Sequence, residues 1–226
     1  MHRIVLRLLV DTCLVALCLF VSAGTLQWWR AWVLLMVMLC IRVCGAIAVY
    51  RVNPALIRER ARLPLHRAQP WADRVLLLGV LGTGFLGLPV IAALDVFRWR
   101  LLPTPVPLVS AGGLLLFAIG WTLKSAALRT NAFATTVVRV QSERAHVVSD
   151  SGLYAVVRHP FYAADPLILI GLSLWLESLV AAVGAVVALT LMVGRLLLEE
   201  RFLRRELPGY REYVERVPHR LIPGIW

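Results

Sequence analysis

The sequence predicts an all-α fold: a polytopic transmembrane helical bundle of about five to six membrane segments, the last two forming a helical hairpin. Three observations predict it. Hydrophobic residues make up 60% of the 226 residues and charged residues only 16%, whereas soluble domains are about half apolar and a quarter charged. The apolar residues fall into blocks long enough to span a bilayer. Arginines are concentrated in every second loop (here called a joint) between these blocks, as the positive-inside rule describes.

The first two apolar blocks cover residues 4–23 and 32–50. The basic start of the first block resembles a cleaved signal peptide, but Asp11 interrupts its apolar region and a second block follows at once. We therefore expect a retained helix. The cysteines lie in these two blocks without the His or carboxylate neighbours of a metal site. We expect no metal, and we expect all of the cysteines to pack between helices as small apolar residues: Cys13, Cys18, Cys40 and Cys44.

Two further long blocks cover about 75–97 and 106–123. Both contain several glycines, which allow helices to approach closely, and Pro89 is expected to kink the first of them. Beyond a polar stretch come two shorter apolar runs, at 163–176 and 179–198. Because only two residues join these runs, we expect an antiparallel hairpin that crosses the membrane and returns.

The Lys and Arg residues predict the orientation. The joints at 51–74 and 124–162 and the tail after residue 201 are rich in them, while the alternate joints hold few. Both termini are therefore expected in the cytosol, and the charge bias suggests a bacterial inner membrane. The net charge of +11 is explained by anionic membrane lipids, and no signature of nucleic-acid binding accompanies it.

The polar and aromatic residues that are best suited to binding or catalysis are most concentrated between residues 141 and 162. This polar stretch ends in an Arg-His-Pro run, in which Pro160 suits the first position of a helix because its missing N–H would be unpaired there. His159 would then lie beside free backbone N–H groups, which attract a carboxylate or phosphate. Tyr154 and Tyr162 are suited to an adenine ring or a ribose. The alternative is that the Arg-His pair only anchors the helix at the lipid interface.

A second cluster ends the last apolar run. Arg195 and Glu199 are four residues apart and share a helix face, and Glu200 follows. Charged side chains at a membrane edge are costly unless they pair or serve a site. The alternative to a site is an interfacial salt bridge between snorkelling side chains.

Together the two clusters resemble the isoprenylcysteine carboxyl methyltransferase family. The resemblance covers about residues 129–226, whereas 1–125 match only as generic membrane helices. It implies two regions: transmembrane helices at 1–125, and a catalytic region with a cofactor loop, hairpin and basic tail at 126–226. The order and spacing of the matching residues make it specific: Asn131, Phe133, Val138, Gln141, Arg144, His146, Val148, Ser151, Gly152, Tyr154, Arg158, His159, Pro160, Tyr162, Arg195, Glu199, Glu200, Gly209, Tyr210, Tyr213, Arg216, Val217, Pro218 and Pro223.

The resemblance implies an S-adenosyl-L-methionine site built by the loop and the last helix. Arg195 would meet the methyl acceptor, and Glu199 suits the ammonium of the cofactor. A Rossmann-type methyltransferase would need a Gly-rich strand–turn–helix motif, and the sequence has none. The residues that the family pattern assigns to the cofactor are Gln141, His146, Val147, Val148, Ser149, Tyr154, His159, Pro160, Phe161, Tyr162 and Glu199.

The expected reaction is methylation of a carboxylate, or another nucleophile, of a lipophilic acceptor at the cytosolic membrane face. An ionised carboxylate needs no general base, whereas a phospholipid amine or a thiol would need one, such as Glu199, Glu200 or a tyrosine. The alternatives are a membrane NADPH-dependent reductase of the sterol-reductase type and a non-catalytic scaffold or transporter. The chain departs from many family members at Ala164, where they have glycine. Asp165 follows Ala164. One interpretation is that Asp165 influences which acceptor is used, and the alternative is that it is an N-terminal helix cap that faces water.

Overall fold

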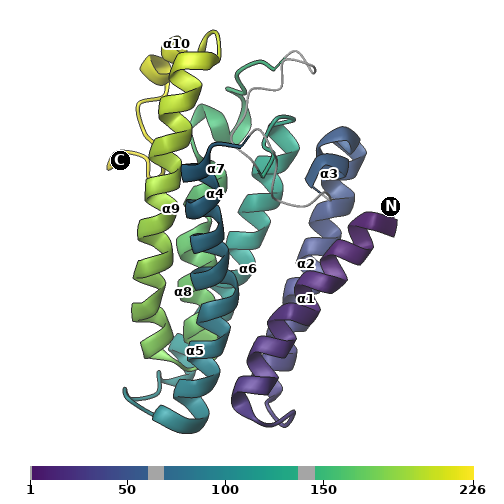
Figure 1. Cartoon of the computed structure of the whole chain (residues 1–226), viewed down its shortest axis with the longest axis vertical. Coiled ribbons are helices and arrows are strands. Elements are labelled where there is room, and N and C mark those ends of the chain that lie inside the picture. Colours follow the sequence, from purple (N-terminus) through teal and green to yellow (C-terminus); the bar gives the residue numbers. More distant parts are fainter. Residues whose placement is uncertain (1, 61–68, 137–145) are drawn as a thin grey trace.

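The computed structural model describes residues 2–60, 69–136 and 146–226, and in these ranges the chain is helical without strands (Figure 1). Gln141, Val138 and Arg144, which the sequence analysis assigned to the site or to the family pattern, lie outside the described residues. The helical elements are α1 (His2–Ala23), α2 (Trp29–Val52), α3 (Pro54–Arg60), α4 (Trp71–Val80), η1 (Leu81–Gly87), α5 (Leu88–Leu94), η2 (Asp95–Trp99), α6 (Pro107–Thr130), η4 (Gly152–Ala155), α7 (Pro160–Ala163), α8 (Asp165–Trp175), α9 (Leu179–Glu206) and α10 (Tyr210–Arg216).

The predicted membrane segments are confirmed. In the described ranges, 5 helical segments are long and apolar enough to cross a bilayer, and the shorter Pro160–Trp175 pairs with α9 as the expected hairpin. The long segments are Ile4–Ala23, Trp29–Val52, Trp71–Trp99, Pro107–Thr130 and Leu179–Glu206. The chain is therefore a multi-pass membrane protein.

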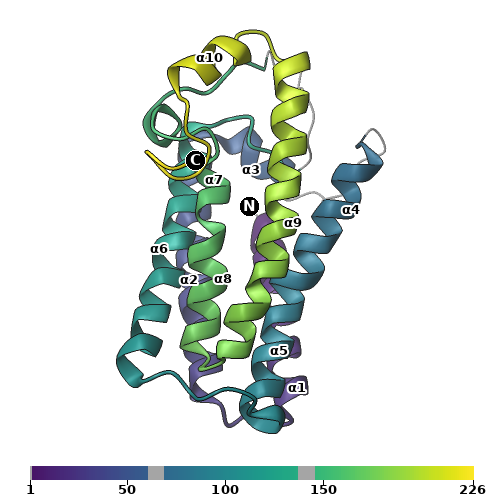
Figure 2. The same cartoon turned by 90° about the vertical axis from the view of Figure 1, so that its left-hand side faces the viewer.

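The helices form a ring. α1 contacts α2 and α5, α2 contacts α6, α6 contacts α8, and α8 contacts α9, which returns to α4 and α5. The two views in Figures 1 and 2 place α3 and α10 towards one end of the helix bundle and the turn between α8 and α9 at the opposite end. Both chain ends lie in the half that holds α3 and α10 (Figure 1). This end corresponds to the joints that the charge pattern assigns to the cytosol.

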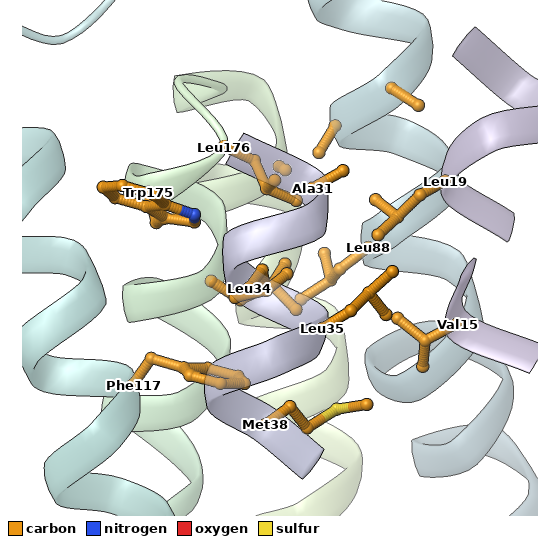
Figure 3. Packing of buried hydrophobic residues seen from close by; sticks show 14 of the residues in the cluster. Val15, Leu19, Ala31, Leu34, Leu35, Met38, Leu88, Phe117, Trp175 and Leu176 are labelled. Atoms are coloured by element: carbon orange, nitrogen blue, oxygen red, sulfur yellow. The ribbon is translucent and has the colours of Figure 1, made fainter. Parts of the chain in front are cut away.

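The apolar core fills the half of the ring nearer the α8–α9 turn. Leu34 and Leu35 of α2, Leu88 of α5, Phe117 of α6 and Trp175 of α8 pack together there (Figure 3). Close packing of this kind holds one end of the bundle rigid. The opposite half is therefore where the helices leave room for a site.

Two expectations about the membrane helices need correction or detail. Cys13, Cys40 and Cys44 are exposed on the outer surface of α1 and α2, so the expectation that they pack between helices is wrong for them; a lipid-facing position is as apolar as a helix interface. At Pro89 the helix continues, but the preceding stretch Leu81–Gly87 is π-helical. Proline cannot donate to the carbonyl one turn back, and π-turns are one way to absorb that loss.

Helices α6 and α8 approach each other closely at two glycines. A Cβ on Gly113 would come within 2.7 Å of Leu174 Cβ and Trp175 N, and one on Gly171 would come within 2.6 Å of Gly113 O. Backbone atoms cannot move aside as flexible side chains do. The two glycines therefore fix the distance between α6 and the helix that leads to the site.

We expect Gly113→Ala to destabilise the protein by about 1–3 kcal/mol, because an added methyl group overpacks this contact. Gly112→Ala is a matched control on the same helix, since a Cβ at Gly112 meets nothing within 4 Å. Thermal unfolding in detergent measures both variants. Equal midpoints for the two variants would contradict the close contact.

Candidate active site

A cavity of about 380 Å³ opens in the half of the ring that holds α3 and α10. Its walls come from α1, α2, α3, α4, α6, α7 and α9, together with the described loops at 131–136 and 146–149. Ligand sites typically have volumes of about 300–1,000 Å³. The cavity is therefore large enough for a small molecule, and both membrane helices and polar loops line it.

Nearly all of the described residues predicted for the site line this cavity. Pro160 does not; it is buried and begins α7, as predicted, with His159 as the N-cap. The structure thus brings together residues that are far apart in the sequence. The predicted residues that line the cavity are His146, Val147, Val148, Ser149, Tyr154, His159, Phe161, Tyr162, Arg195 and Glu199.

Tyr162 connects the two predicted clusters. Its hydroxyl donates to Glu199 Oε2 at 2.6 Å and accepts from Arg195 Nη1 at 2.9 Å. Only Oε2 of the Glu199 carboxylate receives a hydrogen bond from the described residues. The other oxygen is therefore available to a cation in the cavity.

Arg195 is held from a further helix, a feature that the sequence analysis missed. Its Nε donates to Asp73 Oδ1 of α4 at 2.8 Å, and its Nη2 donates to the Thr136 carbonyl at 2.6 Å. Asp73 is fully buried, and Gln69 Nε2 donates to its second oxygen at 2.6 Å. The sequence feature that could have predicted this pairing is an acidic residue at the start of a membrane helix, because such a residue needs an oppositely charged partner.

Aromatic rings line the side of the cavity formed by the loops. Phe133 and His146 stack with ring centroids 4.4 Å apart. Tyr154 is buried, and its burial raises the pKa of the phenol to about 12, so the hydroxyl is neutral. The chain turns sharply at Gly152, where φ is 56° and a Cβ would meet Thr130 Cγ2 at 2.7 Å. These rings are suited to a planar heterocycle.

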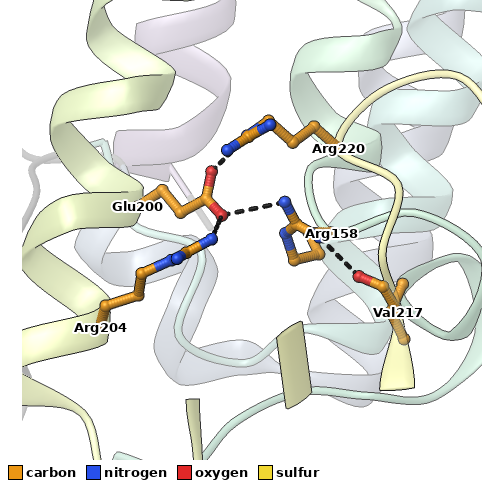
Figure 4. Close-up of polar contacts among 5 residues, drawn as sticks. All are labelled: Arg158, Glu200, Arg204, Val217 and Arg220. Carbon is orange, nitrogen blue, oxygen red and sulfur yellow. Dashed lines mark hydrogen bonds and ion pairs between the residues drawn. The ribbon is translucent and has the colours of Figure 1, made fainter. Parts of the chain in front are cut away.

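Glu200 does not line the cavity and instead holds the C-terminal tail. Its carboxylate binds Arg158 at 2.9 Å, Arg204 at 2.8 Å and Arg220 at 2.6 Å (Figure 4). Arg158 also donates to the Val217 carbonyl at 2.6 Å. This arrangement disfavours Glu200 as a general base and gives it a structural role.

The C-terminal tail also forms hydrogen bonds with the backbone at the start of α7. The N–H groups of Arg158 and His159 donate to the His219 and Arg220 carbonyls, each at 2.9 Å. These two N–H groups are therefore not available to an anion. The His159 Nε2 and the Tyr210 hydroxyl, by contrast, are buried at the cavity without a hydrogen-bond partner in the described part of the chain.

Burial lowers the pKa of His159 from 6.5 to about 4. The unfolded chain therefore takes up this proton at a higher pH than the folded one, and the stability associated with neutral His159 is complete above about pH 6.5 and lost as the pH falls towards 4. We expect the unfolding midpoint to fall over this window and to fall less in His159→Gln. Thermal unfolding between pH 4 and 8 measures this, and identical profiles for the two proteins would refute it.

Charged residues from the first helices line the other side of the cavity. Lys124 of α6 binds Asp165 at 2.6 Å, so Asp165 faces the cavity and is not a water-facing cap. Arg7 and Arg42 both pair with Asp11. The residue that interrupts the first apolar block is therefore neutralised within the bundle.

Known proteins share both the sequence pattern and the fold. The family model for phospholipid methyltransferases matches residues 108–208. Protein-S-isoprenylcysteine O-methyltransferase B of Arabidopsis thaliana is 28% identical over 113 residues, which are 49% of this chain and 57% of that protein. The cobalt-zinc-cadmium resistance protein CzcN of Cupriavidus metallidurans is 31% identical over 80 residues, covering 35% of this chain and 37% of that protein.

The chain thus spans about half the length, or less, of these curated relatives. Among solved structures, the eukaryotic intramembrane Ras methyltransferase ICMT superposes with a TM-score of 0.56 at 18% identity, over 94% of this chain and 73% of that one. The family-model match falls mostly on the second half of the chain, and the structural match covers nearly all of it. The chain therefore resembles integral membrane methyltransferases in part of its sequence, and it has the fold of the solved isoprenylcysteine carboxyl methyltransferase.

Proposed function

We propose that this protein transfers a methyl group from S-adenosyl-L-methionine to a lipophilic acceptor at the cytosolic face of the membrane. One observation carries the proposal: the Glu199–Tyr162–Arg195 cluster lies on a single cavity lined by both polar loops and membrane helices. A water-soluble cofactor and a lipid-soluble acceptor need such a meeting point. The methyltransferase relatives agree with it.

The residues present fit this cofactor. It carries positive charge at its ammonium and sulfonium groups, and Glu199 offers a carboxylate oxygen in the cavity. Its adenine is a flat ring, for which Tyr154 and the stacked Phe133–His146 pair provide surfaces. Its carboxylate and ribose hydroxyls need polar partners, and the unpaired Tyr210 hydroxyl lies at the cavity. When bound, S-adenosyl-L-methionine supplies an electrophilic methyl group.

The protein's contribution to the reaction would be positioning. Tyr162 holds Glu199 in one orientation, while Asp73 and Thr136 hold Arg195, so the polar edge of the cavity is fixed before any ligand enters. Fixed alignment of reacting groups can supply about 7–11 kcal/mol in ideal cases. Arg195 retains N–H groups beyond those used in these contacts, and we propose that they orient the reacting carboxylate of the acceptor.

The acceptor would reach the cavity from the bilayer. Ile4 and Leu8 of α1 and Val49 of α2 line the same cavity as Tyr162, so an apolar chain would find apolar walls on that side. The relatives' names include an isoprenylated cysteine and a phospholipid as the groups acted on. We propose that the acceptor of this protein is a lipophilic acid. We also propose that both termini of the chain lie in the cytosol.

Transfer of labelled methyl groups tests the function. Membranes containing the protein are incubated with methyl-tritiated S-adenosyl-L-methionine, and the lipid extract is fractionated and counted. We expect a labelled lipid product that is absent with Glu199→Gln and unchanged with the exposed control Glu206→Gln. Equal labelling with wild type and Glu199→Gln would reject the assignment of the site, and transfer of hydride from labelled NADPH would indicate a reductase.

A further inference from the structure

The part of the tail after α10, residues 217–226, turns back towards the membrane helices. Both views show the end of the chain nearer to the middle of the bundle than α10 is (Figures 1 and 2). The carbonyls of His219 and Arg220 accept from the start of α7, and Arg220 also binds Glu200 of α9. The tail is therefore fixed to two helices up to Arg220, and the position of the residues beyond it follows from these contacts.

Two contacts give the depth of this segment in the membrane. The apolar run of α9 at 179–198 is about 30 Å long, which matches the hydrocarbon core of a bilayer. Arg220 Nε donates to Glu200 Oε2 at 2.6 Å, and Glu200 lies just beyond that run. The next residue, Leu221, packs against the apolar cluster that contains Met192 of α9. The chain therefore returns to the level of the apolar run at Leu221.

The residues after Leu221 direct apolar side chains outward. Ile222 is 51% exposed and Ile225 is 77% exposed, and residues 222–226 include no charged side chain. Apolar surface gains free energy when it leaves water. At the depth that Leu221 sets, lipid is the apolar surrounding that these two side chains meet.

The backbone of this segment bonds to itself. The Trp226 carbonyl accepts from the N–H groups of Leu221, at 2.9 Å, and Ile222, at 3.0 Å. The Ile222 carbonyl accepts from the N–H groups of Ile225, at 3.2 Å, and Trp226, at 3.1 Å. Pro223 has no N–H group to satisfy. A non-helical segment can meet lipid only if its polar backbone groups are bonded internally, and this closed loop meets much of that demand.

We propose that residues 221–226 form a loop that inserts into the bilayer at the boundary between headgroups and acyl chains, on the side of the membrane where the cavity opens. Ile222 and Ile225 contact lipid in this arrangement. The guanidinium carbon of Arg220 lies 5.4 Å from the centroid of the Trp226 ring, and tryptophan and snorkelling arginine side chains are suited to the headgroup level. Through the backbone bonds of residues 219 and 220, the loop ties the start of α7 to the membrane surface.

Fluorescence of a single labelled cysteine tests this insertion without cofactor or acceptor, and so independently of methyl transfer. The native cysteines are replaced with alanine, a nitrobenzoxadiazole label is attached to Ile225→Cys, and the full chain is placed in phospholipid nanodiscs. We expect blue-shifted emission and quenching by phospholipids brominated near the headgroup end of their chains. Val187→Cys, exposed within the membrane span of α9, is the quenched reference, and Glu215→Cys, exposed on α10, is the unquenched one.

A second substitution in the loop tests the cause of the insertion. Ile222→Asp places a carboxylate at the lipid contact, and we expect it to move the emission of the label at Ile225→Cys to that of the α10 reference. Ile222→Leu should leave the emission blue-shifted and quenched. The unfolding midpoint of each labelled protein establishes that the bundle is intact.

Emission from the unsubstituted loop that matches the Glu215→Cys reference would overturn the proposal, because the loop would then lie in water. Blue-shifted emission that brominated lipid does not quench would also overturn it, by indicating that a protein surface, such as a second copy of the chain, covers the loop. Unchanged quenching in Ile222→Asp would show that the apolar side chains do not cause the insertion.

Discussion

Replacing Arg195 with methionine is expected to lower methyl transfer by on the order of 100-fold or more, because misplacement of the reacting groups by about 1 Å has effects of that size. The substitution removes the donor that holds the Tyr162 hydroxyl at 2.9 Å, and Tyr162 in turn orients Glu199. It also leaves Asp73 buried without its guanidinium partner. Initial rates with labelled S-adenosyl-L-methionine measure the first effect.

The double variant Arg195→Met, Asp73→Asn separates activity from folding. Breaking a buried ion pair from one side costs about 3–5 kcal/mol, whereas removing both charges is often close to neutral. We therefore expect the double variant to recover most of the unfolding midpoint and none of the activity. Recovery of activity along with stability would show that Arg195 acts only through folding.

Replacing Glu200 with glutamine is expected to destabilise the protein by about 3–5 kcal/mol, the usual cost of leaving a buried charge without its partner. Arg158 is 4% exposed and would lose its carboxylate, and Arg204 and Arg220 would lose theirs (Figure 4). The tail after α10 would then be released from α9. Thermal unfolding and limited trypsin digestion of the tail measure the two consequences.

Glu206→Gln is the control for this variant, since it removes an exposed carboxylate from the same helix. It should change neither the unfolding midpoint nor the rate at which trypsin cuts the tail. A Glu200→Gln protein with a wild-type midpoint and a protected tail would show that the tail is held by its apolar contacts alone. Those contacts join Val217 of the tail to the cluster formed by Leu207, Tyr210 and Tyr213.

The sequence was most informative where chemistry and helix geometry coincide. Arg195 and Glu199 had to share a helix face because of their spacing, and Pro160 had to begin a helix because it lacks an N–H group. The membrane segments followed from the length of the apolar blocks. The roles of the individual residues in binding stay predictions, because a shared cavity does not by itself identify a ligand.

Other features depend on contacts between distant segments, which local pattern cannot supply. Asp73 is an isolated acid in the sequence, and only the packing of α4 on α9 makes it the partner of Arg195. Leu221 belongs to a basic tail, and only its packing against the apolar cluster on α9 brings it to the level of the membrane helices. Glu200 follows Glu199 directly, but the helix turns it away from the cavity and towards the tail.

The site combines a rigid framework with a charged interior. Gly113 and Gly171 bring α6 and α8 into backbone contact, and this contact fixes α8, which follows directly after α7. Ion pairs with Asp73 of α4 and Glu200 of α9 then hold Arg195 and Arg158. Preorganisation of this kind is what the proposed alignment of a water-soluble cofactor with a lipophilic acceptor requires.

Calorimetric titration of S-adenosyl-L-methionine into the detergent-purified protein, with NADPH as the competing ligand, tests the central claim most directly. We expect saturable binding of S-adenosyl-L-methionine alone, lost in Glu199→Gln and retained in the control Glu206→Gln. Binding of NADPH, or binding of S-adenosyl-L-methionine that Glu199→Gln leaves unchanged, would contradict the assignment of this cavity as the methyl-donor site.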